Sequence, residues 1–418
     1  MWKIVKIVKD SKGGFARLGS MVRVHNPFRA TLGSSPPYLA GRQNEIQDFD
    51  DALANGPGTH ERISLVTGLR GVGKTVLLNE FEDVARVQGW WVISETATAN
   101  FTERIKDAVF TLASKHLRDH EKVLTGIAVP QIFSIQFADA ETYQLKLSLR
   151  QAITDFLDLQ AQLDEKLGQG PVGLLITVDE LHYSQSDEIR EFGATVQHLV
   201  REDREIAVAM AGIPQAVKPL LASDEARNPV TFLRRANKIE LGLVSDDEVK
   251  KALDEPLTGT GFSWDPDALG LATKACGGYP FMIQLMGQQA FLKRNGTVID
   301  IDSAKEAKGA ARRKLGQLVH APALADLSDV DRTFLLAMAQ DDGPSRMADI
   351  SERLGIDPQY AGTYRRRLIE AEMIASTAYG YVDFELPYMR EYLLDHVAAE
   401  AMGVLSSNNG PDSKDSKG

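Results

Sequence analysis

The chain has 418 residues, and its 47 Lys and Arg against 58 Asp and Glu leave a net charge of −11 at neutral pH. This length allows two or three domains, and an acidic balance excludes a general polyanion binder, so any contact with nucleic acid needs a local basic patch. The single cysteine, Cys276, excludes an internal disulfide and is typical of a reducing compartment. No apolar run approaches the ~18 residues of a membrane span, so we expect a cytoplasmic protein without a membrane partner.

Residues 1–40 read as a basic, extended lead-in. Four lysines recur at three-residue spacing between Met1 and Lys12, without the apolar core and cleavage site of a signal peptide. We interpret this stretch as a basic arm, or as an over-extended start with Met21 as the initiator. Prolines, glycine and serines between residues 26 and 43 favour an extended segment without regular structure.

Strand and helix patterns alternate from residue 41 to residue 244. The expected strands are 62–67, 90–96, 173–179, 205–212 and 237–241. Such alternation is typical of an α/β fold with a parallel sheet covered by helices. An insertion near residues 120–147, with an alternating pattern that predicts a hairpin at 133–147, accounts for the long gap before the third strand.

A glycine-rich octapeptide follows the first of these strands. It matches G-x-x-x-x-G-K-[ST], the P-loop, and a helical pattern begins at its end. Glycines let the backbone aim its N–H groups at phosphates, and the helix N-terminus adds its positive dipole end. A lysine there reaches the β- and γ-phosphates, and a hydroxyl ligates Mg²⁺. The predicted ATP-binding residues are Gly68, Leu69, Arg70, Gly71, Val72, Gly73, Lys74, Thr75 and Val76.

Two acids end the third strand. Gly173–Val178 is apolar and is followed by Asp179 and Glu180, so a buried strand delivers two carboxylates to the sheet edge where ligands bind in open α/β folds. We expect Asp179 to hold Mg²⁺ together with Thr75, and Glu180 to polarise the attacking water as the catalytic carboxylate.

The order of these elements, followed by a helical region, resembles the AAA+ ATPases, in particular the branch that holds archaeal origin-recognition ATPases and STAND signalling ATPases. The lead-in Pro36–Glu45 is similar to the segment that flanks adenine in that branch. Gly277-Gly278-Tyr279-Pro280 is similar to its lid motif, which implies that Pro280 packs near the nucleotide. One departure is that the fourth strand ends in Ala211 and Gly212 at the sensor-1 place, where many AAA+ proteins carry a polar side chain. Since these residues carry no side-chain hydrogen-bonding group, this departure predicts slow hydrolysis.

The resemblance also implies an arginine finger, a residue that stabilises the transferred phosphoryl group of a neighbouring subunit in a homo-oligomer. Arg234 and Arg235 stand at its place, before the last strand, and the sequence does not choose between them. A surface pair or an internal ion pair is the alternative.

The remaining chain is expected to form a helical lid over 245–319, a linker near 318–327, a winged helix over 328–400 and a disordered tail over 406–418. The third helix of the winged helix carries Arg365, Arg366 and Arg367. In a DNA binder this helix would enter the major groove, whereas in a protein-packing module it would not.

These features favour an ATPase that uses ATP and Mg²⁺ to gate duplex-DNA binding or assembly. The alternatives are a STAND-like signalling or defence switch with a protein partner, and a transposition-helper ATPase. STAND proteins usually carry long repeat sensors, and no repeat pattern is present in this sequence.

Overall fold

The computed structural model describes residues 7–9, 15–17, 25–31, 33–119, 147–181, 186–214, 216–217 and 231–395. Nearly all of the expected insertion at 120–147 and the whole expected tail at 406–418 lie outside these ranges. Near the N-terminus, β1 (Ile7–Lys9) and β2 (Phe15–Arg17) pair in an antiparallel hairpin that the sequence did not predict. Residues 33–42 contain turns and bends but no helix or strand, as expected.

Five parallel strands form the central sheet, and all five lie where the sequence predicts them, to within two residues. Their order is β4-β5-β6-β3-β7. The bounds are β3 (Ile63–Gly68), β4 (Trp91–Thr96), β5 (Leu174–Leu181), β6 (Ile206–Gly212) and β7 (Asn237–Leu241). Because the strands are parallel, the residues that follow β3, β5 and β6 meet at one edge of the sheet.

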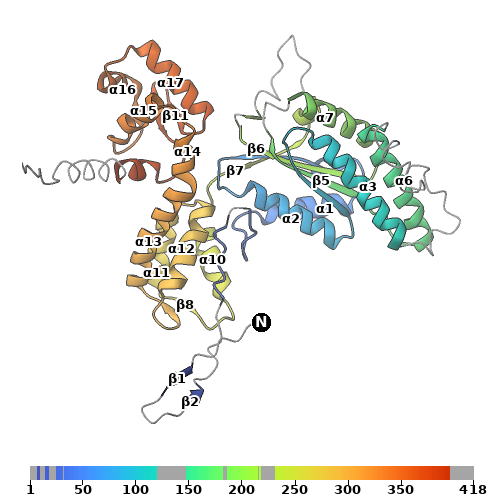
Figure 1. The fold of residues 1–418 in the computed structure, drawn as a ribbon, viewed down its shortest axis with the longest axis horizontal. Coiled ribbons are helices and arrows are strands. Elements are labelled where there is room, and N and C mark those ends of the chain that lie inside the picture. The colour runs from blue at the N-terminus through green and yellow to red at the C-terminus, as the bar shows by residue number, and fades with distance from the viewer. Residues whose placement is uncertain are drawn as a thin grey trace, which may run out of the picture.

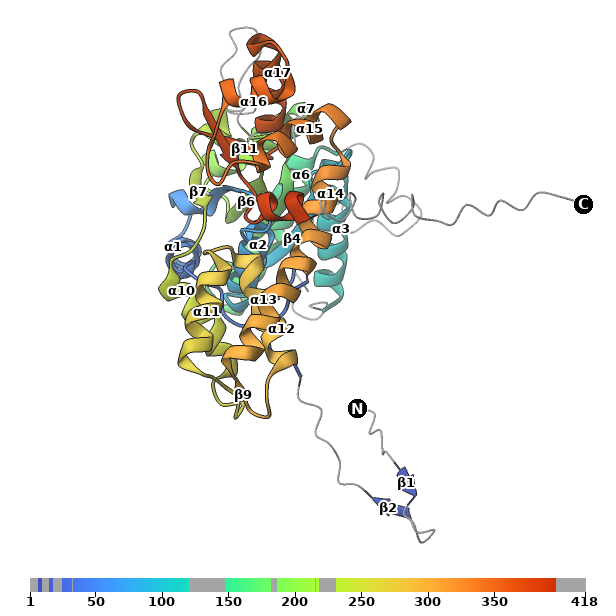
Figure 2. The ribbon, with the colours of Figure 1, turned by 90° about the vertical axis from the view of Figure 1, so that its left-hand side faces the viewer.

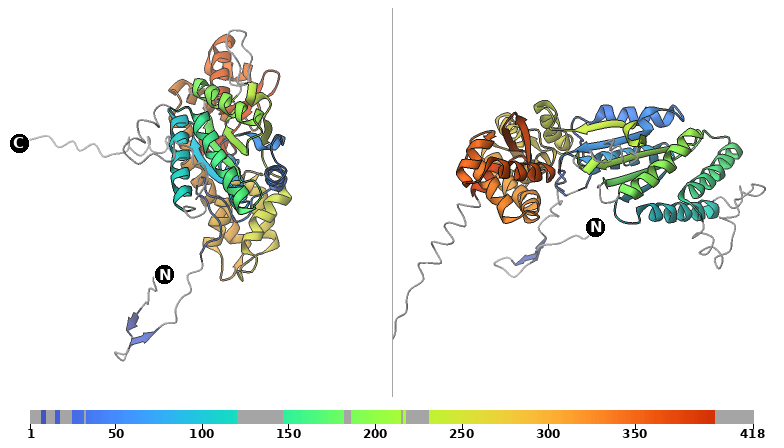
Figure 3. Two further views of the ribbon diagram at one scale, coloured as in Figure 1. Left: turned by 90° about the vertical axis from the view of Figure 1, so that its right-hand side faces the viewer. Right: turned by 90° about the horizontal axis from the view of Figure 1, so that it is seen from above.

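Helices cover both faces of this sheet (Figures 1 and 3). On one face lie α1 (Gln43–Ala54) and α2 (Lys74–Val87); on the other lie α3 (Phe101–Asp119), α6 (Leu149–Leu167) and α7 (Ser186–Arg201). Successive strand residues point to opposite faces, so Leu65 joins one buried cluster while Val66 joins the other. Two short elements, η1 (His60–Arg62) and α9 (Thr231–Arg234), precede β3 and β7.

A helical layer follows the sheet in the chain and packs beside it (Figure 2). Its helices are α10 (Asp246–Asp254), η3 (Glu255–Leu257), α11 (Pro266–Cys276), α12 (Pro280–Lys293) and α13 (Ile301–Leu315). We call this layer, residues 245–315, the lid. Two short strands that the sequence did not predict, β8 (Ser263–Trp264) and β9 (Val298–Ile299), pair within it.

The segment expected to be a linker is helical. After α13 the chain continues as η4 (Gly316–His320), a π-helical turn, and as α14 (Ala321–Ala325). Val319, His320 and Ala323 are buried, so tertiary packing stabilises helix where the sequence pattern is weak. Pro322 is tolerated because it lies in the first turn of α14, where a backbone N–H is not needed.

The last described region, residues 328–395, is here called the C-terminal unit. It contains α15 (Asp329–Ala339), α16 (Met347–Leu354) and α17 (Pro358–Glu370), together with β10 (Ser345–Arg346), β11 (Ile374–Ala378) and β12 (Tyr381–Phe384). The strands form an antiparallel sheet of order β10-β12-β11. Ser328 and Asp357 cap α15 and α17 as the sequence predicts.

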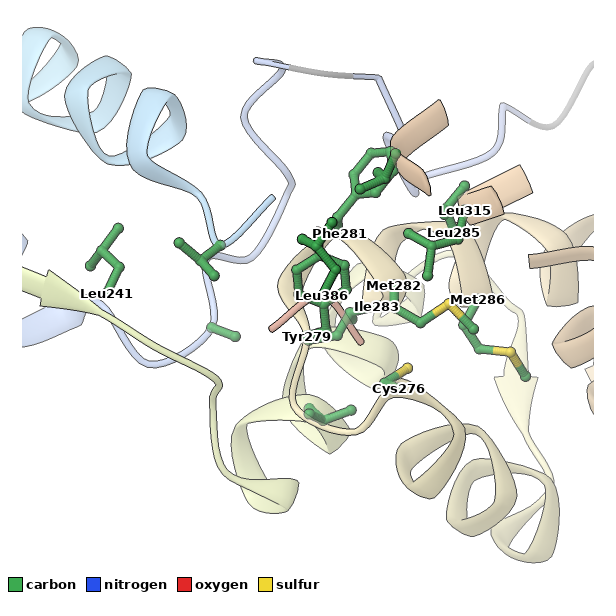
Figure 4. Packing of buried hydrophobic residues seen from close by; sticks show 14 of the residues in the cluster. Leu241, Cys276, Tyr279, Phe281, Met282, Ile283, Leu285, Met286, Leu315 and Leu386 are labelled. Carbon is green, nitrogen blue, oxygen red and sulfur yellow. The ribbon is translucent and has the colours of Figure 1, made fainter. Parts of the chain in front are cut away.

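The C-terminal unit packs on the lid. Leu386 belongs to the same buried cluster as Tyr279 and Ile283 of the lid (Figure 4). The Tyr388 hydroxyl donates a hydrogen bond to the carbonyl of Ala275. Across the described ranges, no helix combines the length and the apolar character needed to cross a bilayer.

Candidate nucleotide-binding site

The P-loop turns between β3 and α2 with the backbone geometry that phosphate binding requires. Gly73, the residue before α2, has φ of 101°, a conformation that favours glycine. Gly71 has φ of 76°, and a Cβ added there would lie 2.1 Å from the Tyr279 hydroxyl oxygen. Both positions therefore require glycine: Gly73 for its dihedral angles, and Gly71 for its dihedral angles and because a side chain would clash with Tyr279.

Lys74 and Thr75 open α2 beside this turn. The Lys74 Nζ donates hydrogen bonds to the carbonyls of Gly68 and Leu69, at 2.6 and 2.8 Å. Burial lowers the pKa of Lys74, and the nearby carboxylates of Glu372 and Asp179 oppose that shift. The Thr75 Oγ1 donates to Asp179 Oδ2 at 2.5 Å. The first helical turn thus places a cation and a hydroxyl at one point.

Asp179 and Glu180 lie at the carboxyl end of β5, as predicted. The pairing of β5 with β6 shifts register between Val178 and Leu181, and Glu180 has a φ of 56°. Such an irregularity re-aims side chains at a strand end. The Glu180 N–H donates to Asp179 Oδ1 at 2.7 Å, and the Glu180 side chain is exposed.

The donor set at this point suits Mg²⁺. Thr75 supplies a hydroxyl oxygen and Asp179 a carboxylate oxygen, and Mg²⁺ prefers oxygen ligands completed by water and phosphate. A complete protein cage is absent: no group of three His, Cys, Asp or Glu side chains that could hold a metal occurs in the described residues. The site fits a metal that arrives with a nucleotide.

A cavity of about 840 Å³ extends from the P-loop between the lead-in, the sheet and the lid. Pro280, the predicted lid residue, lines it, as do Ala97 and Gly212 from the sheet side. Pro280 is the first residue of α12. Leu318 and Pro322, from the segment after α13, line the same cavity.

The lead-in, which the sequence resemblance predicts to lie beside adenine, lines this cavity as well. Tyr38 donates its hydroxyl hydrogen to Glu248 Oε2 at 3.0 Å, and the Gly41 N–H donates to the same oxygen at 2.8 Å. A hydrogen bond from Lys251 is the main cause that lowers the pKa of Glu248. Arg29 and Arg42 also line the cavity. These links hold the lead-in against α10 of the lid.

Tyr279 joins the lid to the P-loop. Its hydroxyl donates to the carbonyl of Arg70 at 2.8 Å, and burial raises its pKa. The Phe281 N–H donates to the carbonyl of Gly71 at 3.3 Å. Figure 4 shows Tyr279 and Phe281 at the start of α12. The sequence marked this motif for its proline, whereas the tyrosine makes the direct contact.

Glu372 is a second residue that sequence reasoning missed. It lies in the turn between α17 and β11 and is 2% exposed, and neither carboxylate oxygen has a hydrogen-bond partner among the described residues. Burial raises its pKa to about 7, although Lys74 and Arg70 lower it in part, and Glu385 raises it further. No local signal distinguishes Glu372 from the surface acids around it.

The sensor-1 place is apolar. β6 is buried along its whole length and ends in Ala211 and Gly212. A Cβ at Gly212 would lie 2.9 Å from Leu181 Cβ and from Val217 Cγ2. Packing therefore excludes a polar side chain at Gly212.

Arg234 and Arg235 do not reach the P-loop of their own chain. Both are exposed and precede β7, whose first residue pairs with Ser64 and whose last pairs with Gly68. They therefore lie at the amino ends of the strands, whereas the P-loop lies at the carboxyl ends.

The three arginines of α17 do not form one positive face. Consecutive helical residues are about 100° apart. Arg367 forms an ion pair with Asp331 at 2.6 Å, and the Arg365 Nη2 donates to Ser376 Oγ at 2.5 Å. Arg366 is exposed. Two of the three guanidinium groups are thus engaged within the chain.

Comparison with known proteins adds two family matches. Residues 38–208 match the family described as AAA ATPase domain. Residues 317–393 match a domain of unknown function, DUF8462, which begins within η4 and covers the C-terminal unit up to residue 393. No match to a curated protein is found.

Several solved structures are similar to this chain at low sequence identity. A Walker-type ATPase of Pyrococcus abyssi is 16% identical with a TM-score of 0.57, over 85% of this chain and 96% of that one. Orc1 of Aeropyrum pernix, solved with DNA, is 15% identical with a TM-score of 0.41, over 88% and 95%. A RuvB variant of Thermotoga maritima is 12% identical with a TM-score of 0.44, over 90% and 99%.

The first of these likenesses establishes the fold, and the family match covers the P-loop, α2 and both acids of β5. The predicted resemblance to the AAA+ proteins is confirmed. Residues 38–208 of this chain are similar to the AAA ATPase domain, a P-loop family.

Proposed function

We propose that the chain binds ATP with Mg²⁺ at the P-loop and hydrolyses it slowly to ADP and phosphate in the cytoplasm. The contact that carries the proposal is the 2.5 Å hydrogen bond between Thr75 and Asp179, next to Lys74. It brings a hydroxyl, a carboxylate and a cation from two strand ends to one point. Thr75 and Asp179 would hold Mg²⁺, and Lys74 would meet the β- and γ-phosphates. The metal would neutralise phosphate charge.

Glu180 is the proposed catalytic carboxylate. Its exposed side chain follows Asp179 directly, on the strand end that faces the cavity. A carboxylate there can accept a proton from a water molecule, as general-base catalysis needs. Slow turnover is proposed because Ala211 and Gly212 supply no side-chain hydrogen bond to orient that water.

The test of ATP binding is Lys74→Ala, measured by titration calorimetry with Mg²⁺–ATP. Loss of the ammonium group removes a charge-assisted contact to phosphate, so we expect binding to become undetectable. Lys250→Ala, an exposed lysine on α10, is the matched control and keeps wild-type affinity. Equal affinities of wild type and Lys74→Ala would refute the proposed site.

We also propose that hydrolysis is completed in a homo-oligomer, with Arg234 or Arg235 acting on the phosphates of a neighbouring subunit. Their position at the edge of the sheet away from their own P-loop supports this role in trans. Arginine can stabilise the charge of the transferred phosphoryl group.

The output that we propose is ATP-gated binding of duplex DNA by the C-terminal unit acting as a winged helix. Three helices and a β-hairpin are in the order this module needs, with Arg366 exposed on α17 and Tyr379 fully exposed at the hairpin turn. Binding through phosphate contacts should weaken with salt, with a log–log slope of roughly −0.9 per contact.

A fluorescent duplex titrated at several salt concentrations, with and without ATP, tests this output. Arg366→Ala should weaken binding and reduce the slope by about one. Glu370→Gln removes a negative charge from an exposed position on α17 and should not weaken DNA binding. No binding of duplex DNA in either nucleotide condition would refute the DNA proposal.

A protein partner is the second candidate output. The ion pair of Arg367 with Asp331 and the hydrogen bond of Arg365 to Ser376 favour it, because they hold two of the three guanidinium groups of α17 against the chain. A STAND-like switch or a transposition helper would then be the better description. Co-purification with and without ATP, with nuclease treatment, separates captured protein from captured DNA.

A further inference from the structure

A second cavity lies between the lid and the C-terminal unit. Its volume is about 530 Å³, which is in the range of small-molecule sites. Its walls come from α11 and α13, which pack against each other (Figure 1), and from Tyr388 of the C-terminal unit. None of its lining residues belongs to the P-loop or lines the nucleotide cavity. We call it the cationic cavity, for the side chains described next.

Positive side chains outnumber negative ones around the cationic cavity. Lys274, Lys308 and Arg312 line it, against a single acid, Asp267. This local excess of positive charge occurs in a chain whose net charge is −11. The side chains of Lys274 and Lys308 form no hydrogen bond or ion pair with any residue that the structure describes. Because unpaired cations that face one cavity repel one another, an anion bound between them would be stabilised.

Tyr388 shows which end of the two helices borders these cations. Its hydroxyl donates to the carbonyl of Ala275, near the end of α11. Its ring centroid lies 4.6 Å from the guanidinium carbon of Arg312, in the last turn of α13. The C-terminal ends of α11 and α13 therefore meet at this tyrosine. Lys308 lies on the same face of α13 as Arg312, because residues four apart in a helix are neighbours.

The acids near the cavity leave much of this positive charge uncompensated. Asp267 is in the first turn of α11, seven residues before Lys274, which is about 10 Å along the axis at about 1.5 Å per residue. Glu391 lies 3.9 Å from the Arg312 guanidinium, and both side chains are partly exposed. Ion pairs of this kind contribute little. The cavity is therefore most positive at the end next to Tyr388.

Arg312 also carries a buried donor that the chain does not satisfy. Its Nε is buried and has no hydrogen-bond partner within the described ranges. A buried donor without an acceptor destabilises the fold. An anion in the cavity that Arg312 lines would supply the missing acceptor. This observation is independent of the charge count and points to the same class of ligand.

We propose that the cationic cavity binds a phosphate group, carried either by a small molecule or by a nucleic-acid backbone. Lys274 and Lys308 meet the phosphate as point charges, and Arg312 donates a charge-assisted hydrogen bond. Three cations and one acid give the lining a charge of +2 (3 − 1), which a doubly charged phosphate neutralises. Leu271 and Tyr388 border the space left for the rest of the ligand. The inference does not depend on the proposed ATP site.

The first test titrates inorganic pyrophosphate by calorimetry into the full chain carrying Lys74→Ala, a background that removes the lysine of the proposed ATP site. We expect binding that weakens at least ~10-fold when Lys274→Ala and Lys308→Ala are added. Lys250→Ala with Lys305→Ala is the matched control, since these lysines are exposed on the lid outside the cavity. Absence of binding, or equal affinity in the two double-lysine variants, would overturn the inference.

Gly270→Leu tests the cavity without removing a charge. Gly270 lies on α11 and lines the cavity, and a Cβ added there would meet no atom within 4 Å. Leucine also favours helix more than glycine does, so we expect the variant to fold. Its side chain fills the space of the ligand, and pyrophosphate binding should again weaken at least ~10-fold. Unchanged binding would mean that pyrophosphate does not occupy this cavity. This variant decides the question if the double-lysine variant does not fold.

A labelled duplex, titrated at several salt concentrations, identifies the source of the phosphate. If a nucleic-acid backbone is the source, alanine at Lys274 and Lys308 should reduce the log–log salt slope by up to about 1.8, or about 0.9 per contact. The control with Lys250→Ala and Lys305→Ala should keep the slope. If a small molecule is the source, the slope stays the same while pyrophosphate binding weakens. Loss of neither would refute the cavity as a phosphate site.

Discussion

His320 should make the fold sensitive to acid. It lies in η4, is 1% exposed, and its Nε2 donates to the carbonyl of Pro387 at 2.9 Å, while Nδ1 has no partner among the described residues. Tyr392 packs edge-on against the ring. Burial lowers the pKa of His320 to about 4, and Pro387 and Glu391 offset this only in part.

The direction of the pH effect on stability follows from the uptake of a proton by the unfolded chain. Below the ordinary histidine pKa of about 6.5, His320 is protonated in the unfolded chain. In the folded chain it stays neutral until the pH falls to about 4. Stability from neutral His320 is therefore present above pH 6.5 and lost as the pH falls toward 4. The difference of about 2.5 units corresponds to about 3 kcal/mol in the free energy of unfolding.

Urea denaturation of wild type and His320→Gln at pH 7.5 and 4.5 measures this effect. Other titrating groups cancel in the difference between the two proteins. We expect wild type to be the more stable at pH 7.5, because the ring packs against Tyr392. At pH 4.5 the difference should shift by about 2–3 kcal/mol in favour of the variant. A difference that does not change with pH would refute the reasoning.

Three further outcomes are expected. Glu180→Gln should keep ATP affinity in calorimetry and reduce phosphate release at least ~100-fold, since an amide cannot accept the proton; wild-type turnover would remove Glu180 from its role. The hydrolysis rate per subunit should rise with protein concentration, and alanine at both Arg234 and Arg235 should flatten that rise. A hydrolysis rate that stays the same over concentrations at which light scattering shows assembly would contradict this. Gly71→Ala should destabilise the fold by about 2–4 kcal/mol in urea, partly recovered with Tyr279→Phe, and no recovery would mean that the hydroxyl contact is not responsible.

The sheet and the P-loop could be predicted because their signals are local. Each strand is a short apolar run beside a helical pattern, and the octapeptide encodes its own turn through Gly71 and Gly73. Asp179 and Glu180 follow from strand direction alone, because parallel strands end at a common edge.

Residues that close the site could not be predicted because their partners are remote in sequence. Tyr279 meets the carbonyl of Arg70 across 209 positions, and Tyr38 meets Glu248 across 210. Glu248 reads locally as an ordinary acid in the first turn of a helix. The expected linker at 318–327 was wrong for a similar reason, since buried Val319 and Ala323 stabilise helix only once the C-terminal unit is packed.

The packing around Gly212 connects the fold to the proposed slow turnover. β6 lies between β5 and β3 at the centre of the sheet, and Gly212 pairs with both Thr67 and Leu181. Any side chain at Gly212 would meet Leu181 and Val217 within 3.0 Å, so a polar group there would disrupt the strand that positions Asp179. A polar side chain at Gly212 and this packing are thus mutually exclusive. If the site binds ATP and orients water poorly, as we propose, it would have the properties of a switch, in which the duration of the bound state carries the signal.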